Sequence, residues 1–145
     1  HENFGICLNV MDTRGFAGFR KREKTVFLKE TFNGSGGVAE LCEYDPRVIV
    51  GIMGGGSGTT RDCLELIRQA QNSGARAALF GRKIVDAADP LLLIEAMRRV
   101  TDGDLYPNED KHLYNDGLAR KGIATLRPAD ADSQVTESVL LERAA

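Results

Sequence analysis

Apolar residues along the chain alternate between short continuous runs and segments in which they recur at helical spacing. Three short runs, rich in β-branched and aromatic residues, are predicted to be strands: residues 25–30, 47–53 and 76–80. Each is followed by a segment with one apolar stripe, predicted to be a helix: residues 37–44, 61–73 and 91–100. The middle run is apolar throughout, which is typical of a strand buried on both faces of a parallel sheet.

The order strand, helix, strand, helix, strand, helix predicts an α/β fold with parallel strands. Three parallel strands cannot close a barrel, and a complete (β/α)8 barrel takes about 250 residues. An open sheet of three parallel strands would leave two unpaired edges. We therefore expect the C-terminal part of a (β/α)8 TIM-type barrel whose N-terminal half lies upstream of this 145-residue chain.

The chain divides into three parts around this repeat. Residues 1–24 are expected to be a helix and a loop leading into the barrel segment, with Gly15 placed to end the helix. The apolar residues of 4–10 also alternate as in a strand, so both alternatives stay open there. Residues 25–122 form the βαβαβα segment, which includes a further helix at 109–121, and residues 123–145 form a polar C-terminal tail.

Composition narrows the class of function. The chain has 19 basic and 21 acidic residues, so its net charge of −2 provides no strong positive field for nucleic acid or anionic lipid. Cys7, Cys42 and Cys63 lack metal-ligand spacing and are odd in number, which argues against a zinc site and a disulfide framework. No apolar run approaches the roughly 20 residues that span a bilayer. We expect a cytoplasmic protein with reduced thiols and no metal, nucleic-acid or membrane partner.

A glycine-rich loop between the second predicted strand and its helix is the first candidate site. It consists of Gly54, Gly55, Gly56, Ser57 and Gly58. Glycines let backbone N–H groups approach an anion, and the positive end of the helix dipole favours negative charge. The loop lacks the lysine of a P-loop and the spacing of the dinucleotide fingerprint, so it predicts phosphate binding without either nucleotide motif. The alternative is a βα loop without function.

The loop after the third predicted strand adds a second signal. Gly81, Arg82 and Lys83 follow that strand directly. In (β/α) barrels a phosphate is frequently held by the loops after the last two strands. The two loops together predict a substrate-phosphate site, and Arg61, in the first turn of the helix that follows the glycine-rich loop, could also reach the phosphate.

Lys29 is the candidate for covalent chemistry. On an alternating strand it points to the same side as Phe27. A lysine inside a barrel is desolvated, which disfavours its charged form and makes the amine a nucleophile able to form a Schiff base with a carbonyl substrate. The alternative is a lysine at the end of a strand whose ammonium group reaches solvent.

Three motifs, in order along the chain, resemble archaeal-type class I fructose-bisphosphate aldolases. Residues 28–34 (LKETFNG) resemble the sixth strand, which carries the Schiff-base lysine; residues 50–55 (VGIMGG) resemble the seventh strand and its phosphate-binding glycines; residues 78–82 (ALFGR) resemble the eighth strand. The resemblance covers about residues 25–103. It implies that Lys29 is catalytic and that Gly54, Gly55, Gly56, Ser57, Gly81 and Arg82 bind the phosphate, with Asn33 as a further candidate site residue.

The chain also departs from that family. Its members usually have Tyr-Thr-Gly-Asp where this chain has Phe32, Asn33, Gly34 and Ser35, and their proton-transfer residues lie on earlier strands without a counterpart in residues 1–24. The resemblance implies a class I aldolase-like lyase acting on a phosphorylated sugar, with no cofactor, as a homo-oligomer or together with the missing half of its barrel. The alternatives are a non-catalytic phosphosugar-binding barrel and a chain that completes a barrel with another polypeptide.

Overall fold

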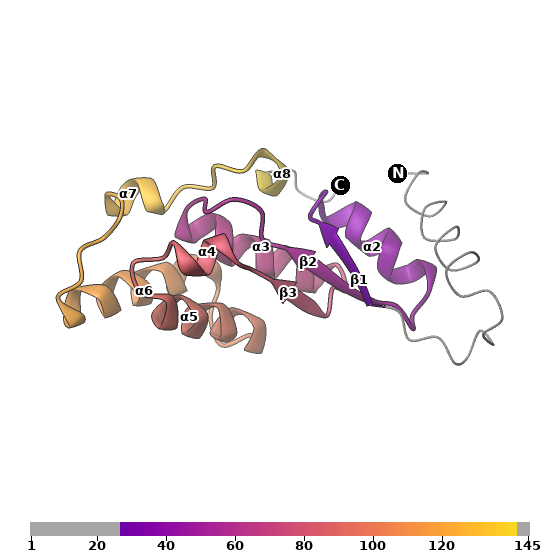
Figure 1. Cartoon of the computed structure of the whole chain (residues 1–145), viewed down its shortest axis with the longest axis horizontal. Helices are drawn as coiled ribbons and strands as arrows, with labels where there is room; N and C mark the ends of the chain where they lie inside the picture. Colours follow the sequence, from indigo (N-terminus) through magenta and orange to yellow (C-terminus); the bar gives the residue numbers. More distant parts are fainter. Residues whose placement is uncertain (1–26, 142–145) are drawn as a thin grey trace.

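The computed structural model describes residues 27–141, apart from the side chains at 110 and 111. Within them, the predicted parallel strands are confirmed (Figure 1). They are β1 (Phe27–Thr31), β2 (Ile49–Met53) and β3 (Ala77–Leu79), and both neighbouring pairs are parallel in the order β1-β2-β3. The helix or strand expected near residues 4–15, and the loop up to residue 24, lie outside the described residues.

The predicted helices are also confirmed, with bounds that differ by a few residues. They are α2 (Ser35–Tyr44), α3 (Thr60–Asn72), α5 (Pro90–Asp102) and α6 (Pro107–Lys121). Short side chains and glycine set their ends. Asp89 accepts hydrogen bonds from the Leu91 and Leu92 N–H groups at the start of α5, and Gly103 ends that helix in the left-handed conformation with φ 79°.

The two faces of the sheet have different environments. Leu28, Val50 and Ile52 point toward the helices and are buried in the main core. On the opposite face, Phe27 and Lys29 are exposed, and Lys29 lies beside Gly51 in the register of β1 and β2. This arrangement agrees with the strand alternation predicted from the sequence, which puts Phe27 and Lys29 on one side.

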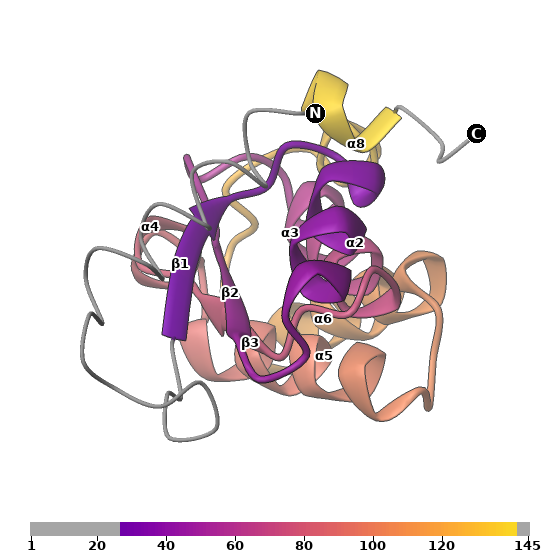
Figure 2. The same cartoon turned by 90° about the vertical axis from the view of Figure 1, so that its right-hand side faces the viewer.

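All the long helices lie on the side of the buried face. Figure 2 shows α2 and α3 beside the strands on this side, with α5 and α6 beyond. Leu64 and Ile67 of α3 form a second core with Ala96 and Val100 of α5, so α5 packs on α3 and not directly on the sheet. The described residues form an open sheet of three parallel strands, so the barrel that the sequence led us to expect is not closed within them.

The described part of the expected polar tail packs against the rest of the protein. It contains the short helices α7 (Ala129–Asp132) and α8 (Ser138–Leu141), and it runs along α3 back toward the sheet (Figure 1). Leu140 is 4% exposed and joins the main core, and Gln69 of α3 donates a hydrogen bond to its carbonyl oxygen at 2.9 Å. The C-terminal segment is therefore part of the folded unit.

Candidate functional site

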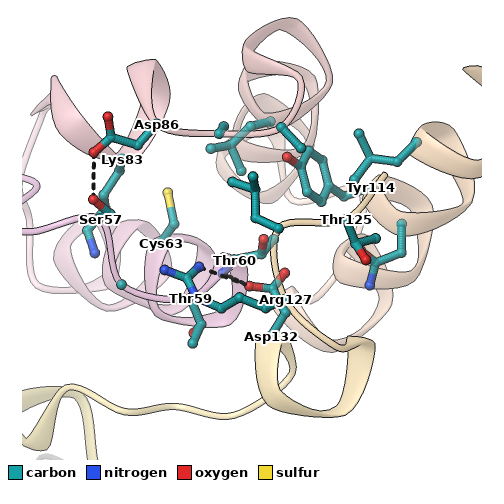
Figure 3. A pocket seen from close by; sticks show the side chains of 17 residues that line it. Ser57, Thr59, Thr60, Cys63, Lys83, Asp86, Tyr114, Thr125, Arg127 and Asp132 are labelled. Atoms are coloured by element: carbon teal, nitrogen blue, oxygen red, sulfur yellow. Dashed lines mark hydrogen bonds and ion pairs between the residues drawn. The ribbon is translucent and has the colours of Figure 1, made fainter. Parts of the chain in front are cut away.

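A pocket of about 130 Å³ lies where the β2–α3 loop meets the short helix α4 (Arg82–Val85), α6 and the C-terminal segment. Figure 3 shows Ser57 and Asp86 at one end of it and Tyr114 and Thr125 at the other. Such a volume holds several water molecules or a small anion, and it is below the roughly 300 Å³ at which ligand pockets usually begin. The pocket lies beyond the carboxyl ends of β2 and β3, where parallel α/β sheets usually bind ligands.

The glycines of the β2–α3 loop have different roles. Gly55 and Gly58 have φ angles of 69° and 57°, a left-handed backbone that favours glycine. Gly54 instead closes the strand ladder, because its N–H donates to the Leu79 carbonyl at 3.3 Å. A Cβ at Gly54 would lie 2.5 Å from the Phe80 ring. The predicted phosphate contact of the Gly54 N–H is therefore not available in this arrangement.

The two loops predicted to share a site lie side by side, and Ser57, Lys83 and Asp86 make the contacts between them. Ser57 Oγ donates to Asp86 Oδ2 at 2.7 Å, which joins the glycine-rich loop to the residue after α4. Lys83 Nζ lies 3.0 Å from the position that a Cβ of Gly58 would take. Lys83 lines the pocket, whereas Gly81 and Arg82 are exposed and lie outside its lining.

The N-terminus of α3 forms one wall of the pocket. Thr59 and Asp62 make a reciprocal capping box there, with the Asp62 N–H donating to Thr59 Oγ1 and the Thr59 N–H donating to Asp62 Oδ2. Asp62 also accepts three hydrogen bonds from the C-terminal segment, two from Thr136 and one from the Glu137 N–H. Burial raises the pKa of the Asp62 carboxyl, but the hydrogen bonds outweigh it, and the net shift is downward.

Two carboxylates of the C-terminal segment pair with an ammonium group and with a backbone N–H group at this pocket. The Lys83 ammonium, whose side chain is 0% exposed, lies 2.6 Å from Glu137 Oε1. The Thr60 N–H, in the first turn of α3, donates to Asp132 Oδ1 at 2.9 Å, and Arg127 lies 3.5 Å from the same oxygen (Figure 3). These are the two kinds of donor, an ammonium and a helix N-terminal N–H, that phosphate groups use.

Cys63 adds a buried thiol to the same pocket. Burial raises its pKa to about 12, and the neighbouring Lys83 ammonium opposes that shift without reversing it. The thiolate is the reactive form of cysteine, so this side chain is inert in the folded protein and serves packing.

The other predicted site residues lie away from the pocket. Lys29 is on the uncovered face of β1 and is exposed within the described structure, so the desolvation expected for a barrel interior is not present there. Asn33 packs against α2, where a Cβ at Gly37 would lie 2.6 Å from its amide nitrogen. Arg61 pairs with Glu65 one turn along α3, at 3.3 Å, and does not line the pocket.

The sequence does not identify the two carboxylates that pair with Thr60 and Lys83 at the pocket. Asp132 and Glu137 belong to a polar segment without periodicity, and they lie 72 positions from Thr60 and 54 positions from Lys83 respectively. Local patterns carry no information about such contacts. The sequence puts Lys83 in the predicted phosphate loop, but the family resemblance implies Arg82 as the cationic ligand.

Among the described residues, no group of three His, Cys, Asp or Glu side chains could hold a metal ion, and no helix is long and apolar enough to cross a membrane. No protein-family model matches the chain, and no characterised protein or solved structure shows significant similarity to it.

Proposed function

We propose that the protein is a class I aldolase-like lyase acting on a phosphorylated sugar, with Lys29 as the Schiff-base residue. The proposal rests chiefly on the position of Lys29. It projects from the face of the parallel sheet that no described element covers, and it lies beside Gly51, over which the Phe27 ring and Leu79 pack. Lys29 is two residues before the end of β1, so it lies about 7 Å below the carboxyl edge on which the glycine-rich loop sits.

The strand order supports the proposal of a barrel. The strands follow one another in the order β1-β2-β3, and the long helices α2 and α3 lie on one side of them, whereas the short α4 does not (Figure 2). Right-handed crossovers in sequential order have this effect, whereas a doubly wound sheet reverses its order and carries helices on both faces. In the proposal, further strands extend the sheet and close it into a barrel. The face that carries Lys29 then lines the inside of that barrel.

The proposed reaction begins with attack of the neutral Lys29 amine on the ketone carbon of the substrate. A carbinolamine forms and loses water to give an iminium ion. Cleavage of the adjacent carbon–carbon bond sends its electron pair into the iminium and releases an aldehyde, after a base has taken the hydroxyl proton. Protonation of the resulting enamine and addition of water then release the second product and restore the lysine.

The phosphate of the substrate is proposed to lie at the β2–α3 loop. In the proposal, Gly55, Gly56 and Ser57 supply backbone N–H groups, although of these three only Ser57 lines the pocket. The neighbouring loop contributes Lys83 from inside the pocket and Arg82 from the exposed surface outside its lining. This set differs from the sequence-based one, because the Gly54 N–H is already bonded to Leu79 and the buried Lys83 lines the pocket.

Trapping of the imine tests the proposal directly. The protein is treated with dihydroxyacetone phosphate and sodium borohydride, and the intact mass and its peptide map are measured. We expect a reduced adduct on Lys29 in the wild type. Both Lys29→Ala and Lys29→Arg should lose it, the second while retaining the positive charge. An adduct that persists in these variants, or that maps to Lys83, contradicts the assignment.

One observation favours a second candidate, a phosphosugar-binding protein without turnover. Besides Lys29, the uncovered face of the described strands carries Phe27, Thr31, Ile49, Met53, Ala77 and Leu79, none of which is an acid or a base at neutral pH. The proton transfers of an aldolase therefore need residues from elsewhere. The binding-only candidate predicts that a phosphate ester raises the melting temperature equally in the wild type and in Lys29→Ala, with no trapped adduct.

A further inference from the structure

We infer that residues 127–141, called the strap below, close the phosphate pocket with the chain's own carboxylates, and that a phosphate ester binds there by displacing them. The inference rests on the proposed phosphate site and assigns it a regulation. The strap includes α7 and α8 and crosses the N-terminal end of α3 (Figure 1).

The first contact is between Glu137 of the strap and Lys83. The Lys83 side chain is 0% exposed, and its ammonium lies 2.6 Å from the Glu137 carboxylate, which is 29% exposed. A buried ammonium is unfavourable unless an anion is beside it. Since Glu137 retains access to solvent and Lys83 does not, exchange of one anion for another is feasible from the strap side.

The second contact is between Asp132 and the N-terminus of α3. The Thr60 N–H donates to Asp132 Oδ1 at 2.9 Å, and this N–H points out of the positive end of a helix of 13 residues. Arg127, at the start of the strap, lies 3.5 Å from the same carboxylate. Asp132 and Glu137 thus present two negative charges to the donors that a phosphate dianion would use.

The part of the strap over the pocket is held mainly by polar contacts. Residues 127–131 are exposed, so that lifting them uncovers little apolar surface. Thr59 Oγ1 donates to the Gln134 carbonyl at 2.7 Å, and the Thr136 N–H donates to Asp62 at 2.7 Å. The apolar anchors are toward the other end, where Leu140 is buried in the main core and the half-buried Val135 and Val139 pack against it. Opening of residues 127–137 therefore releases Val135 from the core while Val139 and Leu140 stay in place.

Titration with inorganic phosphate tests the strap on the full chain. Glu137→Gln removes the competing charge and is expected to bind phosphate about tenfold more tightly than the wild type, with Asp132→Asn changing affinity in the same direction. Asp130→Asn is the matched control, because it removes one exposed carboxylate of α7 and should leave the affinity unchanged. Lys83→Met in the Glu137→Gln background should abolish the gain.

Hydrogen exchange gives a second measurement that does not depend on the variants folding well. Saturating phosphate should speed amide exchange in residues 132–137 of the wild type, and unchanged or slower exchange there would overturn the strap. Equal phosphate affinity of wild type and Glu137→Gln would also overturn it and would leave the phosphate site standing. Tighter phosphate binding by the Glu137→Gln variant, together with the absence of a trapped adduct on Lys29, would support the strap and contradict the proposed lyase.

Discussion

Asp62→Asn is the substitution whose effect the structure specifies most closely. Asp62 is 0% exposed and accepts four hydrogen bonds, two at each carboxylate oxygen. Oδ2 accepts from the Thr59 N–H and Thr136 Oγ1, and Oδ1 accepts from the Thr136 and Glu137 N–H groups. A carboxamide replaces one oxygen by an NH₂ group, so at least one backbone N–H then faces another donor.

The magnitude follows from those bonds. A hydrogen bond to a charged group contributes about 1.5–3 kcal/mol, and a buried donor left unpaired costs about 1–3 kcal/mol. The Thr136 hydroxyl can turn to accept from the new NH₂ group, so we count one lost backbone contact and the weakening of the others. We expect the free energy of unfolding to fall by about 3 kcal/mol near neutral pH, a large part of the roughly 5–15 kcal/mol typical of a domain.

The dependence on pH gives the sharper test. The folded-state pKa of Asp62 is lowered, because its hydrogen bonds outweigh the effect of burial. A lowered pKa stabilises the folded protein above the unfolded value of about 3.9, and this stabilisation is lost as the pH falls through the folded pKa. The carboxamide of the Asp62→Asn variant does not titrate, so the difference in stability between the two proteins should narrow in acid.

Urea unfolding followed by circular dichroism, between about pH 7 and about pH 3, measures this difference. Asp130→Asn, which removes an exposed carboxylate two residues from Asp132, is the control and should stay within about 0.5 kcal/mol of the wild type. A gap between Asp62→Asn and the wild type that is absent at neutral pH, or that stays constant into acid, would refute the role assigned to the Asp62 hydrogen bonds.

Two further predictions concern the pocket and its surroundings. Gly54→Ala should lower the free energy of unfolding by about 1–3 kcal/mol, because the new Cβ would meet the Phe80 ring. Gly56→Ala is the control and should change this free energy little, because the space around Gly56 is open. Thermal or urea unfolding of both variants measures the difference. Cys63 should react with a thiol reagent far more slowly than Cys42 in the folded protein, because Cys63 is the more deeply buried thiol and its pKa is about 12. In denaturant the two thiols should react at similar rates. Peptide-resolved labelling at both residues measures these rates.

Periodicity was sufficient for most of the described fold. The apolar run that contains Val50 and Ile52 indicated a strand with a buried face, although burial on both faces was expected and the described residues cover only one. The helical spacing of Leu64 and Ile67 put both on the face of α3 that packs against α5. Strand alternation likewise placed Lys29 on the face opposite Leu28. Each of these inferences depends on residues close together in the sequence.

The candidate site was predictable in its location and less so in its residues. The glycine-rich loop and the loop beginning at Gly81 had to lie side by side, because they follow neighbouring parallel strands. Whether Arg82 or Lys83 turned into the pocket depended on how α4 begins after β3, and the short α4 buries Lys83 and leaves Arg82 in solvent. If α4 began one residue earlier or later, a different side chain would face the pocket.

The sequence by itself determined an α/β chain of parallel strands with glycine-rich loops at one edge and a lysine on one face. It did so because strand and helix periods, glycine and proline act over a few residues. The tertiary structure alone decided that Glu137 pairs with Lys83 and that Asp132 and Thr136 bind at the start of α3, contacts that span 54, 72 and 74 positions. Such contacts depend on where the whole chain folds back, since a buried cation and a helix N-terminus accept any carboxylate that the fold brings to them.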